Sequence, residues 1–218
     1  MLSHDKTSQA LAIGLAMLAG FIDSLGFMSL GGVFTSFMSG NSTRFAVGLN
    51  DHANWGVALI PLVVIIIFVA GVMLGRIIRH YRPRKPSTAI MIFMSLALLI
   101  AEIVQEWDII GAAIFFMVIA MGAANNIFIK NGEVSIPVTY VTGTLVRLGQ
   151  RMAGSMLGEE NSTWLPYLLL WSGLLMGAFL GAISYHFWEL HSLWVGIAAC
   201  AALTVFCNQM EMTDTAAL

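Results

Sequence analysis

The chain has 218 residues, of which 58% are hydrophobic and only 10% are charged, with a formal net charge of −2. Soluble domains carry about 25% charged residues, so this composition excludes an ordinary soluble domain and predicts an integral membrane protein embedded in a lipid bilayer. The slightly acidic balance, without a basic face, argues against nucleic acid as a partner.

Taken in chain order, the apolar segments form windows that are each long enough to cross a bilayer as a helix. They cover residues 9–29, 55–79, 88–105, 109–129, 164–187 and 191–208. About 20 apolar residues are enough for one crossing, and tryptophans near the window ends are typical of an interfacial belt. We expect an all-α integral membrane protein with about six transmembrane helices, forming a single membrane domain over residues 1–218.

Two polar segments interrupt these windows. The first reads VFTSFMSGNSTRFAVGL (33–49), and the second reads GEVSIPVTYVTGTLVRLGQRM (132–152). β-Branched and aromatic residues at the start of each favour an extended strand, and a half-helix is expected to follow it. Ser39 or Asn41 in the first segment, and Thr142 or Thr144 in the second, are the expected helix N-caps.

The chain also matches itself. At a shift of 103 residues, FMSGNSTRF (37–45) falls on YVTGTLVRL (140–148), so that Gly40 meets Gly143 and Arg44 meets Arg147. At the same shift Asp23 falls on Asn126. These matches, with the windows in the same order, predict an internal duplication with repeats of about 9–105 and 109–208.

The direction of the repeats depends on whether the two polar segments cross the membrane. If they do not, each half crosses three times and the halves are inverted (3+3); if they do, there are eight crossings and the halves are parallel. Lysine and arginine favour the cytoplasmic side. The inverted arrangement places nine of the ten lysines and arginines there, whereas the parallel arrangement places six of the ten. The inverted arrangement with both termini in the cytoplasm is therefore favoured.

Arg44 and Arg147 are expected in the first turn of the two half-helices. The N-terminus of a helix binds anions and carries about half a positive charge, so a positive side chain there opposes the helix dipole. Two arginines in this position indicate that a negative group belongs between them. Inverted-repeat carriers place substrate sites at such broken helices. Alternatively, both arginines extend to the membrane interface.

The sequence thus predicts a small-solute transporter or channel for an anion or a small polar solute, without a cofactor or metal. The candidate substrate-binding residues are Asp23, Gly40, Asn41, Ser42, Arg44, Asn126, Thr142, Gly143, Thr144 and Arg147. Asp23 is singled out because a carboxylate within a span is rare and usually functional or paired. A non-transporting scaffold or partner subunit is the alternative. A membrane enzyme is less favoured, since no nucleophile–base pair or metal motif occurs.

The stretch GFIDSLGFMSLGGVFTSFMSGN (20–41) resembles the signature of the YoaK-type family of small bacterial integral membrane proteins. The resemblance covers essentially the whole chain in length and layout of spans, and the family is of unknown function. It implies a multi-pass protein of the bacterial inner membrane and says little about a substrate. The Gly-x-x-x-Gly pairs at 71/75 and 173/177 favour helix packing, within one chain or between two, and a homodimer is expected.

Overall fold

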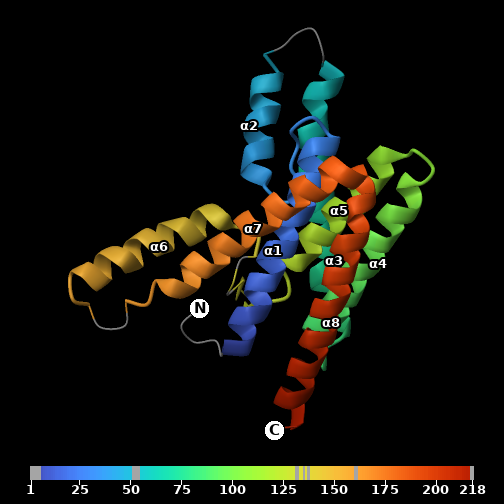
Figure 1. The fold of residues 1–218 in the computed structure, drawn as a ribbon. Helices are drawn as coiled ribbons and strands as arrows, with labels where there is room; N and C mark the ends of the chain where they lie inside the picture. Colours follow the sequence, from blue (N-terminus) through green and yellow to red (C-terminus); the bar gives the residue numbers. More distant parts are fainter. Residues whose placement is uncertain are drawn as a thin grey trace.

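The computed structural model describes residues 6–50, 55–130, 133–134, 136, 138–159 and 162–216. These residues form helices joined by short turns and one small hairpin (Figure 1). The elements are α1 (Lys6–Ser29), α2 (Met38–Gly48), α3 (Trp55–Tyr81), α4 (Pro86–Gln105), α5 (Ile110–Ala124), β1 (Ile129–Lys130), β2 (Glu133–Val134), α6 (Val141–Met156), α7 (Leu165–Trp188), the 3-10 turn η1 (Glu189–Ser192) and α8 (Leu193–Ala216).

Each of the six apolar windows forms a helix, as predicted. Four helical tracts are long and apolar enough to cross a membrane: Lys6–Ser29, Trp55–Tyr81, Pro86–Gln105 and Leu165–Thr213. The last tract contains α7, η1 and α8, and α5 is apolar but has only 15 residues. The molecule is therefore a helical membrane protein, and the count of about six crossings stays a prediction.

Glycines set the closest helix contacts. Gly177 and Gly181 of α7 lie against the backbone of α1 at Met17 and Phe21, where an added methyl group would collide. Gly71 of α3 lies in the same way against the backbone of Ile119 in α5. Small residues let helix backbones approach closely in membranes, where no hydrophobic effect drives association. Both Gly-x-x-x-Gly pairs therefore pack helices within one chain.

These contacts also fix the helix directions. Residue numbers rise in the same direction along α1 and α7 from one contact to the next, so these two helices run parallel. The same holds for α3 and α5. In contrast, α4 and α8 run antiparallel: Thr88 near the start of α4 bonds to Glu211 near the end of α8, and the end of α4 meets η1. Figure 1 shows the start of α1, the end of α8 and the α3–α4 connection at the same end of the bundle.

Two charged side chains close helix ends across the bundle. The Glu211 carboxylate accepts hydrogen bonds from the backbone N–H groups of Ser87 and Thr88, at 2.9 and 3.1 Å. It thereby caps α4, whose own N-cap residue supplies no side-chain hydrogen bond. At the same end, Arg79 donates to the backbone carbonyls of residues 126, 127 and 129, just beyond α5. Neither long-range cap was predicted from the sequence.

The expected strand after α1 does not form. Residues 33–37 have no regular secondary structure, and the one sheet in the described part of the chain is the two-stranded β1–β2 hairpin. The reason is local: the backbone N–H groups of Phe34, Thr35 and Ser36 donate to side chains, so they are not available to a partner strand. A polar backbone inside a bundle must find such partners.

Candidate functional site

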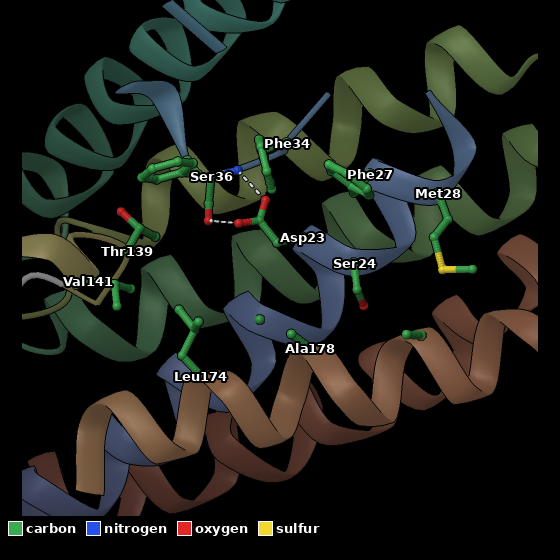
Figure 2. Close-up of a pocket in the computed structure, with 13 residues that line it drawn as sticks. Asp23, Ser24, Phe27, Met28, Phe34, Ser36, Thr139, Val141, Leu174 and Ala178 are labelled. Atoms are coloured by element: carbon green, nitrogen blue, oxygen red, sulfur yellow. Dashed lines mark hydrogen bonds between the residues drawn. The ribbon is translucent and has the colours of Figure 1, made fainter. Parts of the chain in front are cut away.

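A cavity of about 580 Å³ lies between α1, α7 and the two polar segments that lead into α2 and α6. Its polar wall residues are Asp23, Ser24, Ser36 and Thr139. Figure 2 shows Asp23 and Ser24 on α1, Thr139 and Val141 at the start of α6, and Leu174 and Ala178 on α7. The N-cap of α2, Phe37, also lines the cavity. The starts of both half-helices therefore border one space.

Asp23 holds the first interrupted segment in place. One carboxylate oxygen accepts hydrogen bonds from the backbone N–H and hydroxyl of Thr35, at 2.7 and 2.9 Å, and from the backbone N–H of Ser36, at 2.7 Å. The other accepts from the Ser36 hydroxyl at 2.8 Å. The carboxylate lies just before the positive end of α2, where a negative charge is favourable. The chain thus supplies its own anion at this helix start.

Asn41 has a similar structural task. Its side chain is fully buried and bonds both polar groups of the Phe34 backbone: the amide nitrogen donates to the carbonyl at 2.7 Å, and the amide oxygen accepts from the N–H at 3.0 Å. This pairing satisfies backbone groups that would otherwise be costly in the membrane. With both ends of its amide occupied, Asn41 shapes the segment that borders the cavity.

A similar hydrogen bond with different side chains precedes α6. The Thr139 hydroxyl donates to the amide oxygen of Asn125 at 2.9 Å, in the place where Ser36 donates to Asp23. Asn126 instead reaches α3 and donates to the carbonyl of Val72 at 2.9 Å. In the structure, Asn125 bonds Thr139 as Asp23 bonds Ser36, so the residue that corresponds to Asp23 in this contact lies one position before the predicted Asn126. A single shift of 103 does not hold in α1 and α5.

The two half-helices begin earlier than predicted. Their N-cap residues are Phe37 and Tyr140, with nearly equal φ and ψ of −92° and 76°, and −92° and 72°, and neither makes a side-chain cap hydrogen bond. Ser39, Asn41, Thr142 and Thr144 lie inside the helices, so the predicted caps are wrong. Aromatic rings explain this start, since each N-cap ring folds over the glycine three residues later.

Gly40 and Gly143 are those glycines. A methyl group on Gly40 would collide with the ring of Phe37, and one on Gly143 would collide with the ring of Tyr140. The match of these two glycines in the sequence thus reflects ring packing. Ser42 and Thr144 bond within their own helices, to the carbonyls of Met38 and Tyr140, and Thr142 is exposed.

Arg44 and Arg147 lie in the second turn of α2 and α6, not in the first turn as predicted. Arg44 donates to the carbonyl of Gly31 at 3.0 Å and lines a separate cavity of about 300 Å³ beside α3. Arg147 is exposed on α6, which packs on α7, whereas α2 packs on α3. The starts of α2 and α6 border the 580 Å³ cavity, but neither arginine is among the described residues that line it.

The hydroxyl protons around the cavity are already used. Ser24 donates to the Phe21 carbonyl, Ser36 to Asp23 and Thr139 to Asn125. Because a hydroxyl has one proton, these groups offer only lone pairs to a solute. Among the described residues that line the cavity, none is Lys, Arg or His. The wall is therefore mainly apolar, and its few polar groups are hydrogen-bond acceptors, one of them the Asp23 carboxylate.

Of the ten predicted residues, only Asp23 lines this cavity. Sequence reasoning missed Ser36 and Thr139, although they match each other at the shift of 103. That match stands one residue before the aligned stretch 37–45, so extending the alignment would have found it. Ser24 carries no comparable signal, because isolated serines within spans are common in helix contacts.

The fold and the cavity define a helical, multi-pass membrane protein in which two polar segments border one cavity. The chain belongs to the family described as protein of unknown function (DUF1275), whose model matches residues 11–206. It is similar to the UPF0700 transmembrane protein RA0705 of Rhizobium meliloti (strain 1021), with 35% identity over 204 residues that cover 92% of this chain and 86% of the relative.

A second relative agrees with the resemblance noted in the sequence. It is the UPF0700 transmembrane protein YoaK of Bacillus subtilis (strain 168), with 26% identity over 153 residues, which cover 67% of this chain and 68% of the relative. No solved structure matches the chain at a significant level. The predicted YoaK-type family is thus confirmed, and these relatives are described as transmembrane proteins without a stated activity.

Proposed function

We propose that this protein is a small-solute transporter or channel whose solute occupies the cavity beside Asp23. The observation that carries the proposal is a cavity of about 580 Å³ that is bordered by the starts of α2 and α6. Non-helical backbone is tolerated at membrane depth where it is buried in protein or lines a wet cavity, and carriers place their sites at such breaks.

We further propose an inverted internal repeat of three plus three crossings. Two glycine contacts support it: Gly20 of α1 lies against the carbonyl of Leu174 in α7, and Gly122 of α5 lies against that of Phe68 in α3. Adding 102 to a residue number maps α1 onto α5, and adding 106 maps α3 onto α7. The same offsets relate the contact of Gly177 with Met17 to that of Gly71 with Ile119.

The helix directions support inversion in particular. α1 is parallel to α7 and antiparallel to α8. Gly14 of α1 contacts Leu203 of α8, whereas Ile22, later in α1, contacts Gly196, earlier in α8. α4 is antiparallel to α8 and follows α3 through a short turn, so α3 and its parallel neighbour α5 run opposite to α1. Each helix thus runs against its repeat counterpart. A short, 15-residue α5 completes the proposed six crossings.

The proposed location is the bacterial inner membrane, with both termini in the cytoplasm. The α3–α4 end carries the five positive residues Arg76, Arg79, Arg82, Arg84 and Lys85. Lys85 bonds to Asn208 near the end of α8 at 2.8 Å, so the last helix ends on this same side. Clustered lysine and arginine mark the cytoplasmic side of a membrane protein.

The cavity chemistry narrows the solute class. The mainly apolar wall, with a few acceptor lone pairs and one carboxylate, favours a small solute that has an apolar part and donates a hydrogen bond, and a cation ahead of an anion. This moves the emphasis away from the anion expected from the sequence, because that expectation required Arg44 and Arg147 beside the solute. Asp23 would bind such a solute only by sharing a carboxylate that already holds residues 35 and 36.

A thermal-shift screen of the purified protein tests this proposal with matched sets of small organic cations, neutral polyols and amides, and anions. The solute found is then assayed for uptake into proteoliposomes. Ala182 lines the cavity, so Ala182→Phe should fill the space and abolish stabilisation and uptake. Ala202→Phe, at an exposed position of α8, is the matched control and should leave both unchanged. A solute whose binding ignores Ala182→Phe would contradict the proposed cavity.

A second candidate is a non-transporting scaffold or partner subunit. The hydrogen bonds of Asp23 and Asn41 favour it, since both side chains satisfy the chain's own backbone. In that case no solute of any class stabilises the protein, and Ala182→Phe raises thermal stability by filling empty space. The expected homodimer remains part of this proposal, without the glycine pairs that pack inside one chain.

A further inference from the structure

Three potential metal ligands converge at the opposite end of the bundle from the α3–α4 connection. They are Glu102 in the last turn of α4, Glu106 at its C-cap and His191 in η1, and one donor atom of each lies within 4.8 Å of the other two. The imidazole Nδ1 of His191 is 3.2 Å from Oε1 of Glu102 and 3.5 Å from Oε1 of Glu106.

Burial makes this cluster unlike a solvated group of acids. The side chain of Glu102 is only 1% exposed, whereas those of Glu106 and His191 are more than half exposed. The second carboxylate oxygen of Glu102, Oε2, is buried and has no hydrogen-bond partner among the described residues. A buried, under-satisfied carboxylate is costly unless a cation compensates it.

The hydrogen bonds around His191 point to the same need. The side-chain nitrogen of Gln105 lies 3.0 Å from Nδ1 of His191. Oε1 of Glu102 and Oε1 of Glu106 converge on this same nitrogen, which has a single site for a hydrogen or a lone pair. A metal ion between the three side chains would accept the Nδ1 lone pair, in place of the bond from Gln105, and bind both carboxylate oxygens.

We propose that Glu102, Glu106 and His191 bind a divalent transition-metal ion, with Zn²⁺ as the best match. Zn²⁺ takes histidine nitrogen and carboxylate oxygen ligands at about 2.0–2.2 Å. Two such ligands at a tetrahedral ion stand about 3.3–3.5 Å apart, which agrees with the two distances to Nδ1. The ion ties the end of α4 to the turn between α7 and α8 and leaves its fourth position to water or a small anion.

Isothermal titration with ZnCl₂ tests the site on the full-length protein in detergent, after removal of any histidine tag and treatment with a chelator. We expect one ion per chain, with affinity at least tenfold weaker in Glu106→Gln and in His191→Asn, and lost in Glu102→Gln. Mg²⁺ and Ca²⁺, which prefer larger sets of oxygen ligands, should not compete at equal concentration.

His186→Asn and Glu189→Gln are the matched controls, because both residues are exposed near the same turn and neither belongs to the cluster. They should bind Zn²⁺ as the wild type does. If Glu102→Gln fails to fold, the two half-exposed ligands still carry the test. The site is refuted if the wild type shows no saturable binding, as expected if the three side chains only contact one another. It is equally refuted if His191→Asn binds like the wild type.

Discussion

Replacing Asp23 should separate its charge from its role as a hydrogen-bond acceptor. In Asp23→Ala, the backbone N–H groups of Thr35 and Ser36 lose their acceptor, and both residues are buried, at 0% and 5% exposure. An unsatisfied buried donor costs about 1–3 kcal/mol, so two cost about 2–6 kcal/mol. Asp23→Asn keeps an oxygen for both N–H groups and loses only the charge-assisted part of these bonds, about 1–2 kcal/mol.

The assay is unfolding of the purified protein in mixed micelles, followed by circular dichroism and thermal melting. Ser24→Ala is the control, because the Ser24 hydroxyl bonds only to a carbonyl of its own helix, and it should change stability by less than about 0.5 kcal/mol. The expected order of stability is wild type and Ser24→Ala, then Asp23→Asn, then Asp23→Ala. Equal stability of the alanine and asparagine variants would refute the argument, since Asp23 would then not be holding the buried N–H groups.

Three further outcomes follow from the packing and the end contacts. Gly177→Ala should destabilise the protein by about 1–3 kcal/mol in the same unfolding assay, and clearly more than Gly173→Ala, whose added methyl meets its nearest atom only at 3.1 Å. Arg79→Gln should cost about 1.5–3 kcal/mol and speed amide hydrogen exchange beyond the end of α5, because three carbonyls lose a charged donor. Reporter fusions at the C-terminus should report the cytoplasm, and fusions in the 105–108 turn should report the periplasm; a periplasmic C-terminus would rule out the proposed six crossings.

The apolar helices could be predicted because their signal is local and large. A run of about 20 apolar residues has few alternatives to a helix in a bilayer, and all six windows formed one. The glycine pairs were also readable, although only the structure shows that they pack α7 on α1 and α3 on α5. Asp23 stood out for a physical reason, because a carboxylate within a span needs a partner.

The helix starts could not be predicted by the same rules. N-cap preferences describe helices whose first N–H groups meet water or a side-chain cap, whereas α2 and α6 start under an aromatic ring. Asn41 was available as a cap by its residue type, but it bonds the backbone of Phe34 instead. The caps that do form are long-range: Glu211 lies 124 positions from Ser87, and Arg79 lies 47 to 50 positions from the carbonyls that it binds, so no local pattern reports them.

The error of one residue at Asn126 has a related cause. In the proposed repeat, the offset between the halves is 102 in α1 and α5, 103 at the half-helix starts and 106 in α3 and α7, which requires insertions between the elements. Aligning Asp23 with Asn125 instead of Asn126 changes the chemistry assigned to the cavity: Asp23 binds Ser36 in the first half, and Asn125 binds Thr139 in the second. One half thus places a carboxylate before its half-helix and the other a neutral amide. The halves of the proposed repeat therefore differ in charge where the starts of α2 and α6 border the cavity. The solute proposed for this cavity would lie in an electrostatic field directed from the start of α6 toward Asp23, so the two sides of the cavity differ in polarity.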